Sequence, residues 1–135
     1  MRLEITRRAD LAVRALTVLA DADGRVKGPD LAAALDTTPG FVPQVLGPLV
    51  AAGWVRSDPG PTGGYRLTAR LQDITVLEVV EAVEGPTDLG RCVVADRPCG
   101  SAGPCALHVA WARARGELMT SLGGLAMADV KPVEP

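Results

Sequence analysis

Three cysteines and a histidine stand close together in the second half of the chain. Cys92, Cys99, Cys105 and His108 follow the pattern C-x6-C-x5-C-x2-H, and His108 is the only histidine. Thiolate sulfur and imidazole nitrogen are side-chain donors that bind zinc and iron. Cysteines that merely fill a core normally behave as small buried hydrophobes, whereas these lie in or beside a stretch rich in Gly and Pro. The pattern therefore favours a bound metal ion or cluster over bare thiols.

The same spacing bears on which centre is bound. Three thiolates and one imidazole would complete a tetrahedral zinc site, but zinc sites usually contain a C-x2–4-C pair, which this chain lacks. Wider gaps suit an iron–sulfur cluster, in which each cysteine binds a different iron. An iron–sulfur cluster is the favoured prediction, and a Cys3His zinc site is the alternative. His108 taken alone fits an ordinary helix histidine equally well.

Length and composition indicate one compact unit. The chain has 135 residues, of which 47% are hydrophobic and 22% charged, enough to bury a core. No apolar run approaches the roughly eighteen residues of a membrane helix, and no signal peptide opens the sequence. We therefore expect a cytoplasmic protein with no membrane partner. An odd number of cysteines in that compartment argues against a disulfide framework.

Charge is unevenly divided along the chain. The formal net charge of −2 argues weakly against nucleic acid as a partner. Residues 1–70 nevertheless carry nine Lys and Arg against seven Asp and Glu, while residues 71–135 carry five against nine. Four of the basic residues crowd the amino-terminal segment: Arg2, Arg7, Arg8 and Arg14. They suit phosphate contacts, although a solvated helix face explains them equally well on charge alone.

The first half of the chain contains the elements of a winged helix-turn-helix. Apolar periodicity predicts helices over about 8–20, from Gly28-Pro29 to about 35, and over about 39–52. Thr38-Pro39 reads as an N-cap and a first-turn proline, but Pro43 and Pro48 imply a kinked helix or a later start. Two strands, 54–57 and 65–68, flank a loop rich in Gly and Pro. Three helices and a hairpin predict a mainly α fold with a small β wing (α+β).

The second half holds the cysteines and a long helix. A helix over 74–83 precedes a loop of about twenty residues, which is long enough to need a functional reason. The last helix carries an apolar stripe spaced i, i+4, i+7, i+11 and i+15: Leu107, Trp111, Ala114, Leu118 and Leu122. Such a stripe favours pairing with a second copy of the chain, although packing within one chain could also use it. Residues 1–70 are therefore predicted to be the DNA-binding region. Residues 71–135 are predicted to be a sensor loop and dimerisation helix within the same compact unit.

Several of these stretches together resemble the Rrf-type family of small bacterial winged-helix regulators. The resemblance rests on residues 1–3, 11–13, 49–55, 60–65 and 75–83 and on the cysteine loop. It implies a homodimer formed through the last helix, with an iron–sulfur cluster, [4Fe-4S] or [2Fe-2S], between one subunit's loop and the partner's first helix. In IscR-like members the fourth ligand matches His108, and in some NsrR-like members it matches Asp10. Both candidates remain open.

The resemblance also implies which residues read DNA. On the third helix these are Thr38, Gly40, Phe41 and Gln44. Gln44 can pair bidentately with adenine, and Phe41 can contact a thymine methyl group. On the wing they are Arg56, Thr62, Gly63 and Gly64, approaching phosphates or the minor groove. The chain departs from the family at Pro59, where an arginine is common, and at Pro43.

These observations predict a DNA-binding transcriptional regulator. We expect a repressor of a roughly palindromic double-stranded operator, whose cluster senses nitric oxide, redox state or iron–sulfur supply. The alternative is a winged-helix protein-interaction module with structural zinc or bare thiols, which the negative charge and the altered wing favour. An enzyme is not expected, because no catalytic triad, phosphate loop or carboxylate pair is visible.

Overall fold

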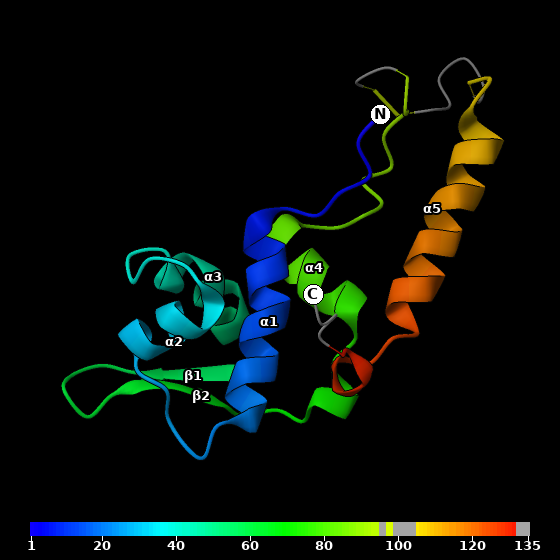
Figure 1. Ribbon diagram of the computed structural model, residues 1–135. Helices are drawn as coiled ribbons and strands as arrows, with labels where there is room; N and C mark the ends of the chain where they lie inside the picture. The colour runs from blue at the N-terminus through cyan, green and yellow to red at the C-terminus, as the bar shows by residue number, and fades with distance from the viewer. Residues whose placement is uncertain (95–96, 99–104, 132–135) are drawn as a thin grey trace.

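A computed structural model describes residues 1–94, 97–98 and 105–131 and contains five α-helices and one two-stranded antiparallel sheet (Figure 1). The elements in chain order are α1 (Arg7–Asp21), α2 (Gly28–Leu35), α3 (Val42–Ala51), β1 (Val55–Asp58), β2 (Gly64–Leu67), η1 (Leu71–Asp73), α4 (Val76–Glu84), α5 (His108–Gly123) and η2 (Met127–Asp129). This layout confirms the predicted α+β fold with a β wing. Within the described part of the chain, no helix is both long enough and apolar enough to cross a membrane.

Helix α1 is the centre of the molecule. Its N-cap Thr6 accepts a hydrogen bond from the Ala9 amide, 3.1 Å away. The apolar positions of α1 are buried, with Leu11 and Leu16 fully so: Ala9, Leu11, Ala12, Ala15, Leu16 and Leu19. Helices α2 and α3 lie on one side of α1 and α4 on the other (Figure 1). Burial on both sides makes α1 the element on which the others pack.

Helix α2 is confirmed, whereas α3 begins later than predicted. Leu31, Ala32 and Leu35 are buried, as the periodicity of α2 requires. The Phe41 amide donates to the Thr38 carbonyl oxygen (3.0 Å), so residues 38–41 form a turn, and Phe41 rather than Thr38 caps α3. The predicted Thr38 N-cap is therefore wrong.

The late start of α3 accommodates one of its two prolines. Pro43 falls in the first turn, where a backbone N–H has no partner within the helix. Pro48 lies inside the helix. The sequence therefore identified the conflict that Pro43 would create, and the turn before α3 resolves it.

The wing is a short hairpin whose glycines are required by close backbone contacts. Asp58 on β1 pairs with Gly64 on β2. A Cβ atom at Gly63 would overlap the Asp58 carbonyl oxygen. Gly64 has φ +139°, and a Cβ there would lie 2.6 Å from the Val26 carbonyl oxygen. The backbone of the wing therefore excludes any side chain at both positions.

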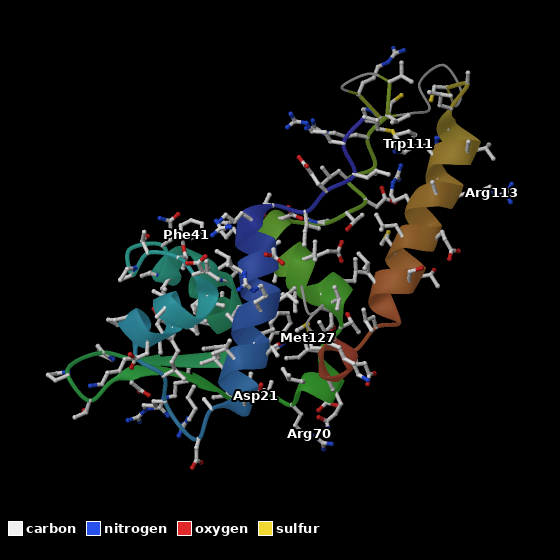
Figure 2. All side chains as sticks on the ribbon, in the orientation of Figure 1. Asp21, Phe41, Arg70, Trp111, Arg113 and Met127 are labelled. Atoms are coloured by element: carbon white, nitrogen blue, oxygen red, sulfur yellow. The ribbon has the colours of Figure 1, made fainter. Side chains whose placement is uncertain are left out.

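Helix α4 begins with a capping box and closes the core. The Thr75 hydroxyl accepts from the Glu78 amide, and the Glu78 carboxylate accepts from the Thr75 amide. Val79, Val80 and Val83 are buried, whereas Leu77 is half-buried. Met127 of η2 packs into the same core and is 1% exposed (Figure 2). The segment after α5 thus returns to the body of the molecule.

The wing yields a stability test. Gly63→Ala should lower the free energy of unfolding by about 1–3 kcal/mol, because the new methyl group overlaps backbone that cannot rotate away. Gly40→Ala is the control, since no atom lies within 4 Å of that Cβ position. Urea unfolding measures both. Equal stability of the two variants would contradict the tight wing turn.

Candidate functional site

Two of the three cysteines lie among the described residues, and Cys99 lies outside them. Cys92 sits in a narrow turn in which its amide donates to the Arg97 carbonyl oxygen (2.8 Å) and its Sγ accepts from the Val94 amide (3.4 Å). Cys105 lies immediately before α5, and its carbonyl oxygen accepts from the His108 amide (3.1 Å). Both cysteine side chains are half-buried.

Cys105 and His108 line a cavity of about 240 Å³ between the loop and α5. The loop contributes Asp88, Gly90, Arg91 and Val93, and the chain from Cys105 onward contributes Cys105, His108, Trp111, Ala112 and Arg115. The helical members are spaced i, i+3, i+4 and i+7, so they share one face of α5. Figure 2 shows Trp111 at the amino-terminal end of α5, near the loop. An ion pair of 3.0 Å between Arg115 and Asp88 ties this face to the loop.

The donor set suits a metal or cluster, but the described residues supply only part of it. Cys105 and His108 share the cavity and offer sulfur and nitrogen ligands. Across the parts of the chain that the structure covers, no three Cys, His, Asp or Glu side chains converge on one point. Cys99 is not among those residues. Among the described residues, Cys105 and His108 thus offer the sulfur and nitrogen donors that a metal or cluster binds.

Asp10, the other candidate fourth ligand, lies apart from this cavity. It is in the first turn of α1 and does not line the cavity. Its carboxylate is 53% exposed and lies 3.9 Å from Arg14, one turn further along the helix. An exposed ion pair of this kind contributes little to stability. Asp10 is therefore accessible to a group brought by another molecule.

The predicted DNA-contacting residues lie in the turn before α3, in the first turn of α3 and on the wing. Thr38, Gly40 and Gln44 are exposed, and Phe41 is half-buried against the core. On the wing, Arg56 and Thr62 are exposed, Gly64 is half-buried and Gly63 is buried. The structure explains Gly63 by contacts within the chain. The roles of the whole set on DNA stay predictions.

Helix α5 leaves its apolar side chains uncovered. None of its sixteen residues, all of which the structure describes, is buried. Leu107 and Leu118 are 50% and 44% exposed, Ala114 is exposed, and Trp111 and Leu122 are half-buried. The helix contacts the body through α4, where Leu77 Cδ2 lies 3.4 Å from the Cβ position of Gly123 (Figure 1). The rest of α5 extends away from the core.

Sequence reasoning missed the loop side of the cavity. Asp88, Arg91 and Arg115 carried no motif, because their proximity depends on how the loop folds back. The spacing of His108, Trp111 and Arg115 on one helix face is the signal that could have revealed half of the site. That spacing overlaps the dimerisation stripe only at Trp111.

Comparison with known proteins identifies the family. A family model described as Rrf2, iron-dependent transcriptional regulator, matches residues 5–132. The chain belongs to the Rrf2 family. An HTH-type transcriptional regulator of Mycobacterium tuberculosis is 33% identical to this Rrf2 chain over 132 residues, which are 95% of the chain and 81% of that protein. The HTH-type transcriptional regulator IscR of Aliivibrio salmonicida is 26% identical over 129 residues, 96% of the chain and 73% of IscR.

A solved structure shows the same fold. CymR, the global cysteine regulator of B. subtilis, matches with a TM-score of 0.74 at 22% identity, covering 95% of each chain. Like its family and its relatives, this Rrf2 protein is a DNA-binding transcriptional regulator and not an enzyme. Both sequence-based predictions are confirmed at that level.

The Asp88–Arg115 pair can be tested separately from any bound group. Arg115→Ala should speed amide hydrogen exchange in residues 88–94, because the ion pair holds this segment against α5. The midpoint of global unfolding should barely move, since a half-exposed ion pair contributes at most about 1 kcal/mol. Arg113→Ala is the matched control, as Arg113 points away on the other side of α5 (Figure 2). Exchange rates that do not differ between the two variants would show that the pair does not hold the loop.

Proposed function

We propose that this protein is a cytoplasmic, homodimeric repressor whose Cys92, Cys99 and Cys105 hold an iron–sulfur cluster. The shared cavity of Cys105 and His108, facing the segment that carries Cys92, is the observation that carries the proposal. The fourth ligand is either His108 of the same chain or Asp10 of the partner subunit. When bound, such a cluster supplies one-electron chemistry and reactivity toward nitric oxide and oxidants. Its family's description as iron-dependent regulators supports this assignment.

The position of Cys105 adds a physical reason for anionic ligands. Cys105 directly precedes the first turn of α5, where unpaired backbone N–H groups point outward. The amino end of a helix stabilises negative charge placed against it. Arg91 and Arg115 add two guanidinium groups to the same cavity wall. The amino end of α5 and these guanidinium groups therefore suit an anionic centre bound in this cavity.

Hydrogen bonds couple the start of the loop to the centre of the fold. The Thr6 amide donates to Glu84 Oε1 and Arg8 Nη2 donates to the Val83 carbonyl oxygen, each at 2.7 Å. Glu84 is the last residue of α4, and Thr6 and Arg8 begin α1. A displacement of the loop is thereby passed to α1, which carries α2 and α3. In a dimer, such a displacement changes the spacing of the recognition helices, which must lie about 34 Å apart to bind one face of DNA.

Anaerobic purification tests the cluster. The wild type should be coloured and contain iron and sulfide, and Cys105→Ala should lose both. Trp111 and Trp54 provide an internal comparison, because Trp111 lines the cavity and Trp54 packs at the wing side of the core. Loading should quench tryptophan emission in Trp54→Phe, where Trp111 remains, and far less in Trp111→Phe.

The same measurement separates the alternatives. Colourless protein with one zinc per chain would rule out the iron–sulfur cluster and favour the zinc-stabilised interaction module. Loss of iron in Asp10→Ala but not in His108→Ala would identify the carboxylate as the fourth ligand, and the reverse result would identify the imidazole.

The uncovered stripe of α5 supports the dimer. Exposed apolar side chains in such a row mark an interaction surface. Leu118→Glu should convert the dimer to monomer in sedimentation velocity, because a carboxylate would be buried in the apolar seam. Thr120→Glu is the control, since Thr120 lies about 200° around the helix from Leu118. A Leu118→Glu variant that sediments like Thr120→Glu would remove α5 from the interface.

A further inference from the structure

The helix-turn-helix itself carries no positive charge. Residues 28–51 contain no Lys or Arg and two acidic residues, Asp30 and Asp36. The exposed residues of α3 are all uncharged: Pro43, Gln44, Gly47, Val50 and Ala51. Neutralisation of phosphates by Lys and Arg nevertheless supplies essentially all of non-specific DNA affinity. The cations that bind the backbone must therefore come from elements beside the recognition helix.

Three arginines stand side by side on the wing sheet. Arg56 on β1 is directly opposite Arg66 on β2 in the register. Val26 extends the sheet, since it exchanges both backbone hydrogen bonds with Tyr65, at 2.9 and 2.8 Å. Arg25, next to Val26, is thereby placed beside Arg66. We call Arg25, Arg66 and Arg56 the arginine row.

The alternation of side chains places this row on the outer face of the sheet. Val55 is buried and Val26, Tyr65 and Leu67 are half-buried against the core. Successive residues of a strand point to opposite faces, so their neighbours in the row point outward. All three arginines are exposed, as this requires.

A single carboxylate pairs with two of the three arginines in the row. Like charges directly opposite on neighbouring strands destabilise a sheet. Asp58, whose side chain is only 20% exposed, places Oδ1 3.1 Å from Arg56 Nε and Oδ2 3.0 Å from Arg25 Nε. Among the residues described, Arg66 has no ion pair. One carboxylate against three guanidiniums leaves a local charge of about +2 on this exposed surface.

We propose that the arginine row is the phosphate-binding surface of the wing and that Asp58 is its positioning residue. Arg25, Arg56 and Arg66 neutralise backbone phosphates of duplex DNA that the helix-turn-helix cannot. Asp58 keeps Arg25 and Arg56 extended over the sheet in the unbound protein. The row also supplies the charge that the wing tip lacks at Pro59. The proposal rests on the DNA binding of this Rrf2 protein and assigns where its affinity resides.

Fluorescence anisotropy with a labelled duplex of arbitrary sequence, about 30 base pairs long, tests the row across a salt series. Arg25→Gln and Arg66→Gln should each bind about tenfold more weakly at about 50 mM salt, and each should lower the slope of log K against log salt by about 0.9. Arg70→Gln is the control, because Arg70 is an exposed arginine beside η1, away from the wing (Figure 2). It should leave affinity and slope unchanged.

The role of Asp58 requires a coupled measurement. In the Asp58→Asn background, Arg25→Gln should cost much less than its roughly tenfold effect in the wild type, because Arg25 is no longer held in place. An undiminished loss would overturn the positioning role of Asp58. Urea unfolding of each variant confirms that the compared proteins are folded.

The outcomes of these binding measurements distinguish the arginine row from DNA binding as such. If Arg25→Gln and Arg66→Gln bind the duplex with the affinity and slope of Arg70→Gln, the arginine row is overturned while DNA binding stands. A folded wild-type dimer that binds no duplex at any salt concentration would overturn DNA binding itself.

Discussion

The burial of α1 is the constraint on which the rest of the structure depends. Leu11 and Leu16 are fully enclosed, and α2, α3 and α4 all pack against the same helix. The amino end of α1 is also fastened to the end of α4 by Thr6 and Arg8. One helix therefore packs both against the helix-turn-helix and against the half of the chain that carries the cysteines. A close-packed interior resists independent movement of its parts, so the two halves share one mechanical frame.

Local patterns predicted the elements whose partners are close in sequence. The buried face of α2 and the existence of α4 followed from apolar periodicity. The start of α3 did not, because Thr38-Pro39 satisfies the usual cap pattern while Pro43 needs the first-turn position. Pro39 and Pro43 both suit a first-turn position, and because α3 begins at Val42, Pro43 is the one that occupies it. The sequence singled out Gly63 as a residue of the wing that approaches DNA. In the structure, the Asp58 carbonyl oxygen across the turn leaves no room for a side chain at this position.

The residues of the cavity that are close in sequence could be predicted, whereas those contributed by distant segments could not. Cys105 and His108 are neighbours in sequence, so their shared cavity follows from their spacing. Their closeness to Asp88 and Arg91 depends on the path of the loop, which has little periodicity to indicate it. The contact of Arg25 with Asp58 spans the whole helix-turn-helix and forms only when Val26 joins the wing sheet. The net charge of the chain likewise did not indicate the cluster of arginines on the wing, because that cluster depends on which residues are paired between strands.

The attachment of α5 at one end gives it the geometry of a lever. Its carboxyl end is fixed at Gly123 against Leu77 and, just beyond, by the burial of Met127. Its amino end carries the cavity of Cys105 and His108. A helix of sixteen residues is about 24 Å long, so a rotation of about 5° at the fixed end moves the other end by about 2 Å. A small rotation at the fixed carboxyl end thus becomes a larger displacement at the cavity, and a displacement at the cavity becomes a small rotation at the fixed end. In a dimer paired along α5, the two helices would have to move together.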